Sequence, residues 1–345
     1  MKPIRWLCVL ATLLIPALAH AGPADGKLDI YFNDTEGGAS TLIVTPTGES
    51  VLVDTGNPGE RDPKRIYEAT KLAGLKKIDH LVITHYHVDH FGGAAELVKM
   101  IPFGEIYDNS DLNPSRDRPT PEYLAIPSDK RVVANPGELI PLQQGKGAPI
   151  SLKFLAARKS VIDPPPGARE NEFCKEAHGK AMDLSDNANS IVMLLSFGDF
   201  RFYDGGDLTW NIEHDLACPV NRVGTVDVYQ VTHHGLAQSN NPVLVKALAP
   251  TVAIMNNGPT KGCEPEVFAT LKSTPSIQTI FQLHKNLRPD GAENNTTPEL
   301  TANSEPTAQC KGNYVKLSVS PDGSSYSVSI PATGLEKTYQ TRKHD

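Results

Sequence analysis

The sequence predicts an α/β fold in which two β-sheets pack face to face and helices cover their outer faces. Short β-rich runs are concentrated in two halves of the chain, and helical stretches lie between them. With 345 residues, 39% hydrophobic and 21% charged, the chain has the composition of a globular protein large enough to bury two sheets. The layers follow because a sheet buries one face against its partner and the other against helices.

The N-terminal residues 1–21 have the three zones of a secretory signal. A short apolar stretch follows two basic residues and ends in Ala19-His20-Ala21, and this stretch is too short to span a bilayer. We therefore expect residues 1–21 to be removed. Residues 22–345 would then form one mature domain, periplasmic or secreted, with no stable membrane insertion.

The first half begins as a β-meander and continues with helices and strands in alternation. Turns that contain Gly or Pro separate its first three runs. A helical stretch is stopped by Gly74, and a buried strand then enters a histidine-rich loop. Strands are expected over 28–32, 41–44, 50–54 and 78–84, and a helix over 64–72.

The second half repeats this alternation and closes with a hairpin near 314–330, whose strands are joined by Pro321-Asp322-Gly323-Ser324. Two segments rich in Pro, Asp, Asn and Gly, at 109–150 and 158–188, are expected to be surface insertions that shape the mouth of an active site. Strands are expected over 190–197, 200–203, 226–232, 251–255 and 277–283, with helices over 243–248 and 265–271.

Four cysteines would remain in the mature chain: Cys174, Cys218, Cys263 and Cys310. Their spacings match no zinc pattern of paired, closely spaced cysteines. An even number in an oxidising compartment allows two disulfides, in three connectivities among which the sequence does not choose. Buried free thiols are the alternative.

Residues 84–93, Thr-His-Tyr-His-Val-Asp-His-Phe-Gly-Gly, place three histidines and an aspartate within six residues, directly after a buried strand. Imidazole and carboxylate groups are the ligands that zinc, manganese and iron accept in hydrolytic sites. In extended backbone His85 and His87 point to the same side, and a turn into the next helix presents Asp89 and His90 to a neighbouring point. One loop could therefore serve two adjacent metal ions.

This segment matches the H-x-H-x-D-H signature of the metallo-β-lactamase-fold hydrolases at every position, and the sequence resembles that family over about residues 28–285. Further matches follow in the family's order: Leu52-Val53-Asp54-Thr55-Gly56, Gly206-Asp207 and Thr232-His233-His234-Gly235. The resemblance implies a four-layer αββα sandwich. It also implies one or two divalent ions, zinc or alternatively manganese, at the edge between the sheets.

The resemblance assigns roles to single residues. The implied metal ligands are His85 and His87 for the first ion, Asp207 as a bridge, and Asp89, His90 and His233 for the second ion. Asp54 and Asn189 would lie behind the ligands and orient them. Asp89 could also accept the proton of the nucleophile. His234 would act on the substrate side, or would exchange roles with His233.

The sequence departs from the family at one ligand. Most members have another histidine before the Gly-Asp pair, but here residues 186–193 read Asp-Asn-Ala-Asn-Ser-Ile-Val-Met. This stretch, with the later His-His-Gly, resembles the subgroup related to the metallo-β-lactamase-like domain of the competence DNA-uptake protein ComEC. The first site would then bind its ion more weakly than the second, unless His178 supplies a ligand. His284, at the end of a strand, could reach the site rim as a catalytic residue or be an ordinary strand-end histidine.

Two metal ions at such a site would activate water for hydrolysis. The first hypothesis is a phosphodiester substrate, including nucleic acid, although the formal charge of −7 and the absence of a long Lys/Arg cluster argue against a general binder of phosphate backbones. One alternative is hydrolysis of a small cyclic amide or ester, as in β-lactamases or lactonases. Another is a non-catalytic ligand-binding module with a degenerate metal site. The expected partner is a small-molecule or nucleic-acid substrate, and no oligomeric state is predicted.

Overall fold

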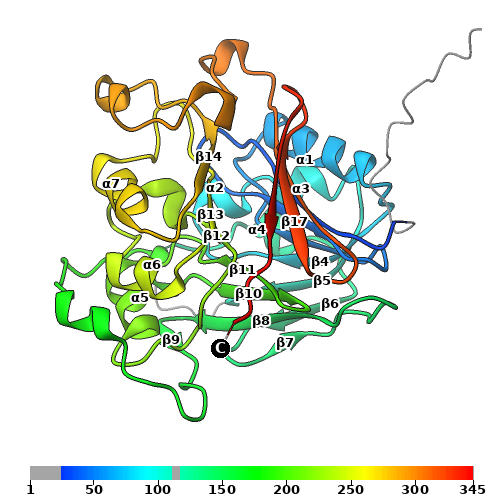
Figure 1. Cartoon of the computed structure of the whole chain (residues 1–345). Coiled ribbons are helices and arrows are strands. Elements are labelled where there is room, and N and C mark those ends of the chain that lie inside the picture. Colours follow the sequence, from blue (N-terminus) through cyan, green and yellow to red (C-terminus); the bar gives the residue numbers. More distant parts are fainter. Residues whose placement is uncertain (1–24, 111–116, 345) are drawn as a thin grey trace, which may run out of the picture.

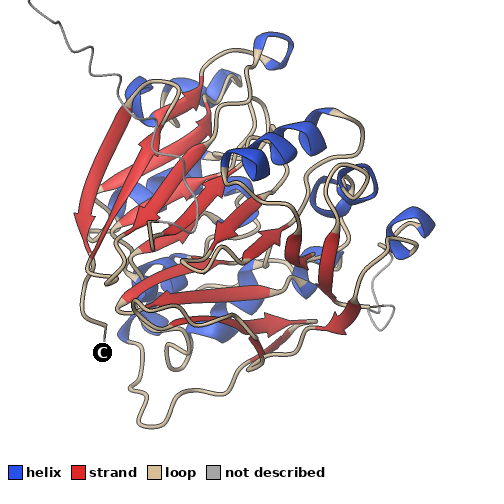
Figure 2. Cartoon of the chain, turned by 90° about the vertical axis from the view of Figure 1, so that its right-hand side faces the viewer, coloured by secondary structure: helices blue, strands red, loops and turns tan. Residues whose placement is uncertain are grey.

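The computed structural model describes residues 25–110 and 117–344, so the predicted secretory signal lies outside the described residues. Within these ranges the strands form two sheets of nine strands each. Helices α1 and α3 lie on one side of the strands and helices α5, α6 and α7 on the other (Figure 1). Figure 2 shows strands through the middle of the molecule and helices around them. The predicted α/β fold class is thus confirmed. Over the described residues, no helix combines the length and apolar character needed to cross a membrane.

The first sheet runs in the order β18-β17-β16-β1-β2-β3-β4-β5-β6. Its strands are β1 (Leu28–Phe32), β2 (Thr41–Val44), β3 (Ser50–Val53), β4 (Ile78–Val82), β5 (Phe103–Asp108), β6 (Lys130–Val133), β16 (Val315–Val319), β17 (Ser325–Ile330) and β18 (Leu335–Gln340). Strands β3 to β6 are parallel, whereas the others pair antiparallel. Four helices accompany them: α1 (Arg61–Leu72), α2 (Val88–Phe91), α3 (Ala94–Leu97) and α4 (Pro121–Leu124).

The second sheet runs in the order β15-β14-β13-β12-β11-β10-β8-β7, with β9 paired to β8. Its strands are β7 (Leu139–Ile140), β8 (Ile150–Ala157), β9 (Ser160–Val161), β10 (Val192–Phe197), β11 (Phe200–Asp204), β12 (Val228–Gln230), β13 (Val252–Met255), β14 (Thr279–His284) and β15 (Thr301–Asn303). Strands β11 to β15 are parallel. The helices on this side are α5 (Trp210–Ala217), α6 (Pro242–Leu248) and α7 (Pro265–Ser273). Short 3₁₀ turns are η1 (Glu172–Glu176), η2 (Asp186–Asn189), η3 (Thr232–Gly235), η4 (Pro289–Ala292), η5 (Pro298–Leu300) and η6 (Thr307–Gln309).

Alternation along the strands produces the four layers. In β1, Ile30 and Phe32 enter the core between the sheets, while Tyr31 packs on the helix side. In β11, Phe202 points to the same central core and Tyr203 to the helices of the second sheet. The rings of Phe32 and Phe202 meet across the sheets with centroids 5.7 Å apart. Both faces are therefore buried in the central strands of each sheet, such as β1 and β11.

The two segments expected as insertions contain regular structure and a covalent link. Segment 109–150 includes α4, and it supplies β6 and β7, one edge strand for each sheet. Segment 158–188 is joined to the end of α5 by the disulfide Cys174–Cys218. Cys263 and Cys310 are free thiols. The pair 174–218 is therefore the one that the fold brings together.

Four parallel strands end at the same edge of the molecule. Strands β3 and β4 of the first sheet meet β11 and β12 of the second there, and the backbone N–H of Ile191 donates to the Thr84 carbonyl oxygen across the junction at 2.9 Å. Gly206 has a φ of +53°, and a Cβ at this position would lie only 3.0 Å from the Cβ of Thr84. This close approach brings the polar residues after each strand into one place.

Candidate metal centre

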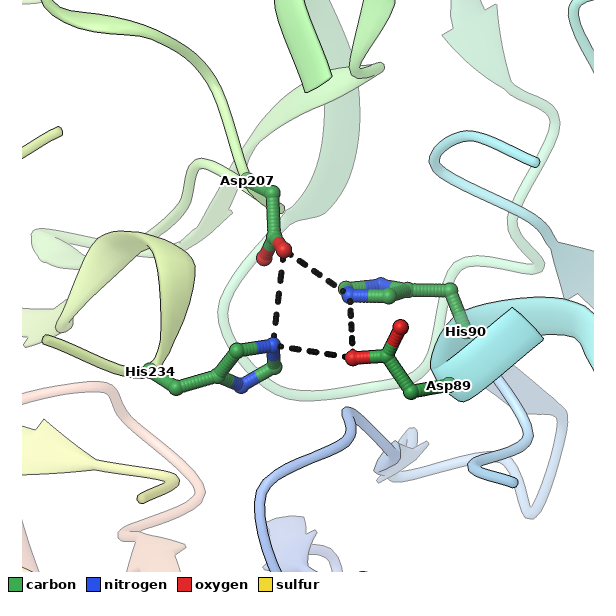
Figure 3. A group of neighbouring side chains, drawn as sticks. All are labelled: Asp89, His90, Asp207 and His234. Carbon is green, nitrogen blue, oxygen red and sulfur yellow. Dashed lines mark hydrogen bonds and ion pairs between the residues drawn. The ribbon is translucent and has the colours of Figure 1, made fainter. Parts of the chain in front are cut away.

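Four side chains from three chain segments converge at the edge between the sheets (Figure 3). Asp89 and His90 belong to α2, Asp207 follows β11, and His234 follows β12. Their ligand atoms all lie within 4.8 Å of one another. His90 Nε2 lies 3.1 Å from Asp207 Oδ2 and 3.6 Å from Asp89 Oδ2. His234 Nε2 lies 3.4 Å from each of the same two oxygen atoms. We call these four residues the metal centre.

The separations fit four ligands around one divalent cation. With metal–ligand bonds of about 2.0–2.2 Å, tetrahedral ligand atoms lie about 3.3–3.6 Å apart. Among the described residues, both ring nitrogens of His234 and Nε2 of His85 are buried without a hydrogen-bond partner. Buried polar atoms of this kind are costly unless something satisfies them. The residues present therefore fit a metal ion.

Asp54 orients one of these ligands from behind. Asp54 Oδ2 lies 2.6 Å from His90 Nδ1, and the same carboxylate accepts hydrogen bonds of 2.8 Å from the backbone N–H and the hydroxyl of Thr84. Because Nδ1 faces Asp54, Nε2 of His90 is directed into the metal centre. The side chain of Asp54 thus lies beside a ligand and outside the ligand set.

The residues assigned to the first ion lie next to the metal centre but form a looser set. His85 Nε2 is 3.9 Å from Asp207 Oδ2, and the rings of His85 and His87 have centroids 4.7 Å apart. His87 Nε2 lies 3.3 Å from Asp117 Oδ2. Asp117 belongs to segment 109–150 and follows no recognisable pattern, so the sequence offered no signal for it. It adds a carboxylate beside the first site, where a third imidazole is missing.

The two consecutive histidines after β12 occupy different places. His233 Nε2 lies 3.4 Å from Asp207 Oδ2, but it also lies 3.4 Å from Asn187 Nδ2, and its Nδ1 is 3.0 Å from Ser239 Oγ. His234 alone of the pair belongs to the metal centre. Both have a φ of 55°, so the backbone turns here and strand alternation no longer decides which ring points inward. The geometry favours His234 as the ligand, the reverse of the preference based on sequence.

Asn189 acts on the motif loop through another carboxylate. Its side-chain amide donates to Asp186 Oδ1 at 2.9 Å, and Asp186 Oδ2 accepts the backbone N–H of Tyr86 at 2.6 Å. Tyr86 lies between the first two histidines of the motif. Asn189 therefore lies in a chain of hydrogen bonds that holds this loop.

Two further histidines have their contacts elsewhere. The ring of His178 packs against Trp210, with centroids 5.0 Å apart, and the His178 carbonyl oxygen accepts the Trp210 indole N–H. The buried His284 Nε2 lies 2.6 Å from Asp34 Oδ1. The sequence allowed His284 either a catalytic place at the site rim or the role of an ordinary strand-end histidine. Its ring turns toward Asp34, in the segment after β1, and not toward the metal centre.

In the metal centre, burial and the neighbouring charged side chains shift the pKa values of the aspartate and histidine residues. Burial would raise the pKa of Asp207, but His234 and His90 hold that pKa well below its usual range. Burial would lower the pKa of His90, but Asp207 and its neighbouring carboxylates hold it well above the usual value. Burial and the adjacent His90 lower the pKa of His85. The carboxylates thus attract positive charge at this point, as a cation site requires.

Lys261 reaches the centre from the loop after β13. Its Nζ lies 2.5 Å from Asp89 Oδ2, and the lysine side chain is 38% exposed while that of Asp89 is 17% exposed. The ammonium group therefore lies on the outer side of the four ligands. A lone lysine in a loop carries no spacing signal, which is why the sequence did not reveal it.

A family model described as the metallo-beta-lactamase superfamily matches residues 34–173. Recombination protein 2 of Haemophilus influenzae is 26% identical over 228 residues, 65% of this chain and 24% of that protein. ComE operon protein 3 of Bacillus subtilis is 24% identical over 278 residues, 73% of this chain and 30% of that protein. A UPF0173 metal-dependent hydrolase of Polynucleobacter asymbioticus is 34% identical over 98 residues, 26% of this chain and 33% of that protein.

The chain thus spans about a quarter to a third of the length of these relatives. The family model covers the complete H-x-H-x-D-H segment, and two of the relatives match most of this chain. The two-sheet fold places that segment where its ligand atoms meet those of the second half. Residues 34–173 thus match the metallo-beta-lactamase superfamily, and over most of its length the chain is similar to the ComEC-like competence proteins.

Proposed function

We propose that the chain is an exported, zinc-dependent hydrolase of phosphodiester bonds, acting on a nucleic acid or a small diester. Lys261 carries this proposal, because its half-exposed ammonium lies at the outer side of the metal centre, against Asp89. A cation there can pair with a non-bridging oxygen of an anionic diester. A neutral lactone offers no such charge.

Asp54, Asp89 and Lys261 have different roles in the proposed hydrolysis. Divalent ions, when bound, supply an activated water near neutral pH and polarise the scissile group. Asp54 holds His90 in place, and Asp89 accepts the proton of the attacking water. When the substrate anion pairs with Lys261, the lysine releases the carboxylate of Asp89 for this role. Lysine and aspartate would thus change partners as the substrate binds.

Export and the nucleic-acid option have separate support. The disulfide Cys174–Cys218 is typical of an oxidising compartment, which agrees with the secretory pattern in residues 1–21. Two relatives have names that refer to recombination and to the ComE operon. N-terminal sequencing of protein recovered from the periplasm should begin at Gly22. An intact N-terminus in the cytoplasm would contradict export.

A substrate panel tests the reaction. Bis(p-nitrophenyl) phosphate, a chromogenic cephalosporin and an acyl lactone are assayed side by side with added zinc or manganese, with Asp207→Ala as the control for contaminating hydrolases. We expect turnover of the phosphate diester above that of the other two. Faster turnover of the cephalosporin or the lactone would replace the proposal by hydrolysis of a cyclic amide or ester. If the protein turns over none of the three substrates when fully loaded with metal, the proposal is wrong and a non-catalytic ligand-binding module is favoured.

A further inference from the structure

We infer that Asp34, His284 and Cys310 form a second metal site, structural in role and suited to zinc. The three residues come from distant parts of the chain: Asp34 follows β1, His284 ends β14, and Cys310 follows η6 on the way to β16. Their ligand atoms all lie within 4.8 Å of one another. None of them belongs to the metal centre, so this site is independent of the proposed reaction.

The distances leave room for an ion after small shifts. His284 Nε2 lies 2.6 Å from Asp34 Oδ1, and Cys310 Sγ lies 3.2 Å from Asp34 Oδ2 and 3.9 Å from His284 Nε2. Around a tetrahedral zinc ion, oxygen, nitrogen and sulfur ligands lie about 3.3–3.7 Å apart. The imidazole and the carboxylate would have to separate by less than about 1 Å. One imidazole, one carboxylate and one thiolate are a ligand set that zinc accepts.

The surroundings already fix the three side chains. His284 and Asp34 are almost fully buried, and Cys310 is half-buried, so a fourth position can open toward solvent. Arg65 Nη1 lies 2.9 Å from Asp34 Oδ2, and Asp34 Oδ1, the atom that faces His284, also accepts the backbone N–H of Glu36 at 3.0 Å. The backbone N–H of Gly312 donates to Cys310 Sγ at 3.4 Å. Among the described residues, Nδ1 of the buried His284 has no hydrogen-bond partner, so only Nε2 serves the group.

The charges favour a divalent cation. Without a cation the Cys310 thiol donates its proton to the Asp34 carboxylate, with Sγ 3.2 Å from Oδ2. When an ion binds, a metal–sulfur bond forms and the thiol proton leaves to solvent. The carboxylate and the thiolate then balance the two positive charges. Arg65 is shared between Asp34 and Glu36, whose Oε1 lies 2.9 Å from Arg65 Nη2.

Such an ion would fasten the chain after η6 to both sheets. Asp34 belongs to the first sheet side and His284 to the second. Cys310 lies shortly before Tyr314, whose ring packs against Tyr31 of β1 with centroids 5.6 Å apart. One ion would hold all three segments. Structural zinc sites of this kind contribute directly to folding stability.

Cobalt substitution tests the site, because a thiolate bound to Co²⁺ gives a charge-transfer band that imidazole and carboxylate ligands do not give. The full chain, with its disulfide intact, is titrated with Co²⁺ and then with Zn²⁺. We expect the band in the wild type, and its loss together with one equivalent of metal in Cys310→Ser. Cys263→Ser is the matched control, because Cys263 is the other free thiol and lies outside the group. It should keep the band, and Zn²⁺ should raise its melting temperature by more than that of Cys310→Ser, in which only the metal centre still binds zinc.

Three results would overturn the site. The first is the absence of the band in a wild-type protein whose metal centre is loaded. The second is a band that survives in Cys310→Ser. The third is a thiol titration in denaturant that finds Cys263 and Cys310 joined to each other. Turnover of any substrate has no part in these readouts, so failure of the proposed reaction is distinguishable from failure of this site.

Discussion

Asp54 Oδ2 lies 2.6 Å from Nδ1 of His90, and Asp54 holds this position with a left-handed backbone, at a φ of 60°. This conformation costs an ordinary residue about 1–2 kcal/mol, whereas Asn and Asp adopt it more readily. The carboxylate is anchored by the two hydrogen bonds from Thr84. The strand end is therefore shaped so that one aspartate can orient one ligand of the metal centre.

Replacing Asp54 by Asn should weaken metal binding while leaving the fold intact, because Asn tolerates the same φ but cannot accept the His90 proton as strongly. Loss of such a contact behind a ligand lowers metal affinity by about 10–100-fold. Competition with a chromophoric chelator measures the affinity. Asp62→Asn is the control, since Asp62 is equally buried and contacts Arg61 and Asn57. If Asp54→Asn and Asp62→Asn bind metal with equal affinity, Asp54 does not orient the ligand His90.

Replacing Asp207 or His87 by Ala should abolish hydrolysis and lower the metal content. Asp207 faces both sites, so its loss should affect both ions, whereas loss of His87 should affect the first ion alone. In the wild type, metal titration should show one tight and one weak equivalent, because the second site has the fuller ligand set. Wild-type metal content and rate in both variants would refute the ligand assignment. Two equally tight ions would point to a further ligand, with Asp117→Asn the first variant to test.

The motif loop could be predicted from sequence because its ligands follow one another directly after a buried strand, where the backbone fixes their directions. The choice between His233 and His234 could not, since both adopt a φ of 55° that no local pattern announces. Lys261 contacts Asp89 of the metal centre and Asp117 contacts His87, both from loops whose course depends on the whole fold. The pairing of Cys174 with Cys218 likewise depends on proximity in space.

The same distinction holds for the strands. Strand β1 and the parallel strands β11 to β14 were predictable because they are short β-rich runs with buried apolar residues, whereas the short strand β15, Thr-Ala-Asn, was not predicted. Strand β6 was not, because Lys130–Val133 is an edge strand with exposed or half-exposed side chains throughout. Strand β18 is similar, with one buried residue, Tyr339, among six. Edge strands are held by backbone pairing, which leaves little trace in the sequence.

Replacing Lys261 by Met should raise the KM for bis(p-nitrophenyl) phosphate by about tenfold, corresponding to about 1.4 kcal/mol of lost ion pairing. Metal content should stay at the wild-type level, because Lys261 is no ligand. Lys261→Arg should retain part of the affinity, and Lys285→Met, which removes an exposed lysine, should have no effect. Steady-state kinetics separates KM from kcat. If Lys261→Met instead lost metal at an unchanged KM, the lysine would serve only to hold Asp89.

Glu213 should make the protein less stable as the pH rises. It is fully buried in α5, where its Oε2 accepts the backbone N–H of Asn241 at 2.7 Å, and burial raises its pKa from 4.5 to about 7. Between these pH values the folded protein keeps a proton that the unfolded chain has released, so the stability from this group is complete below pH 4.5 and is lost as the pH rises through 7.

The glutamine in Glu213→Gln cannot ionise. The free energy of unfolding of this variant minus that of the wild type should therefore increase by about 2–3 kcal/mol from pH 5 to pH 8. Urea unfolding at several pH values measures the difference. Glu68→Gln, at an exposed glutamate of α1 paired with Lys71, should run parallel to the wild type. Parallel curves for Glu213→Gln as well would mean that the buried carboxyl group is ionised in the folded protein across this range.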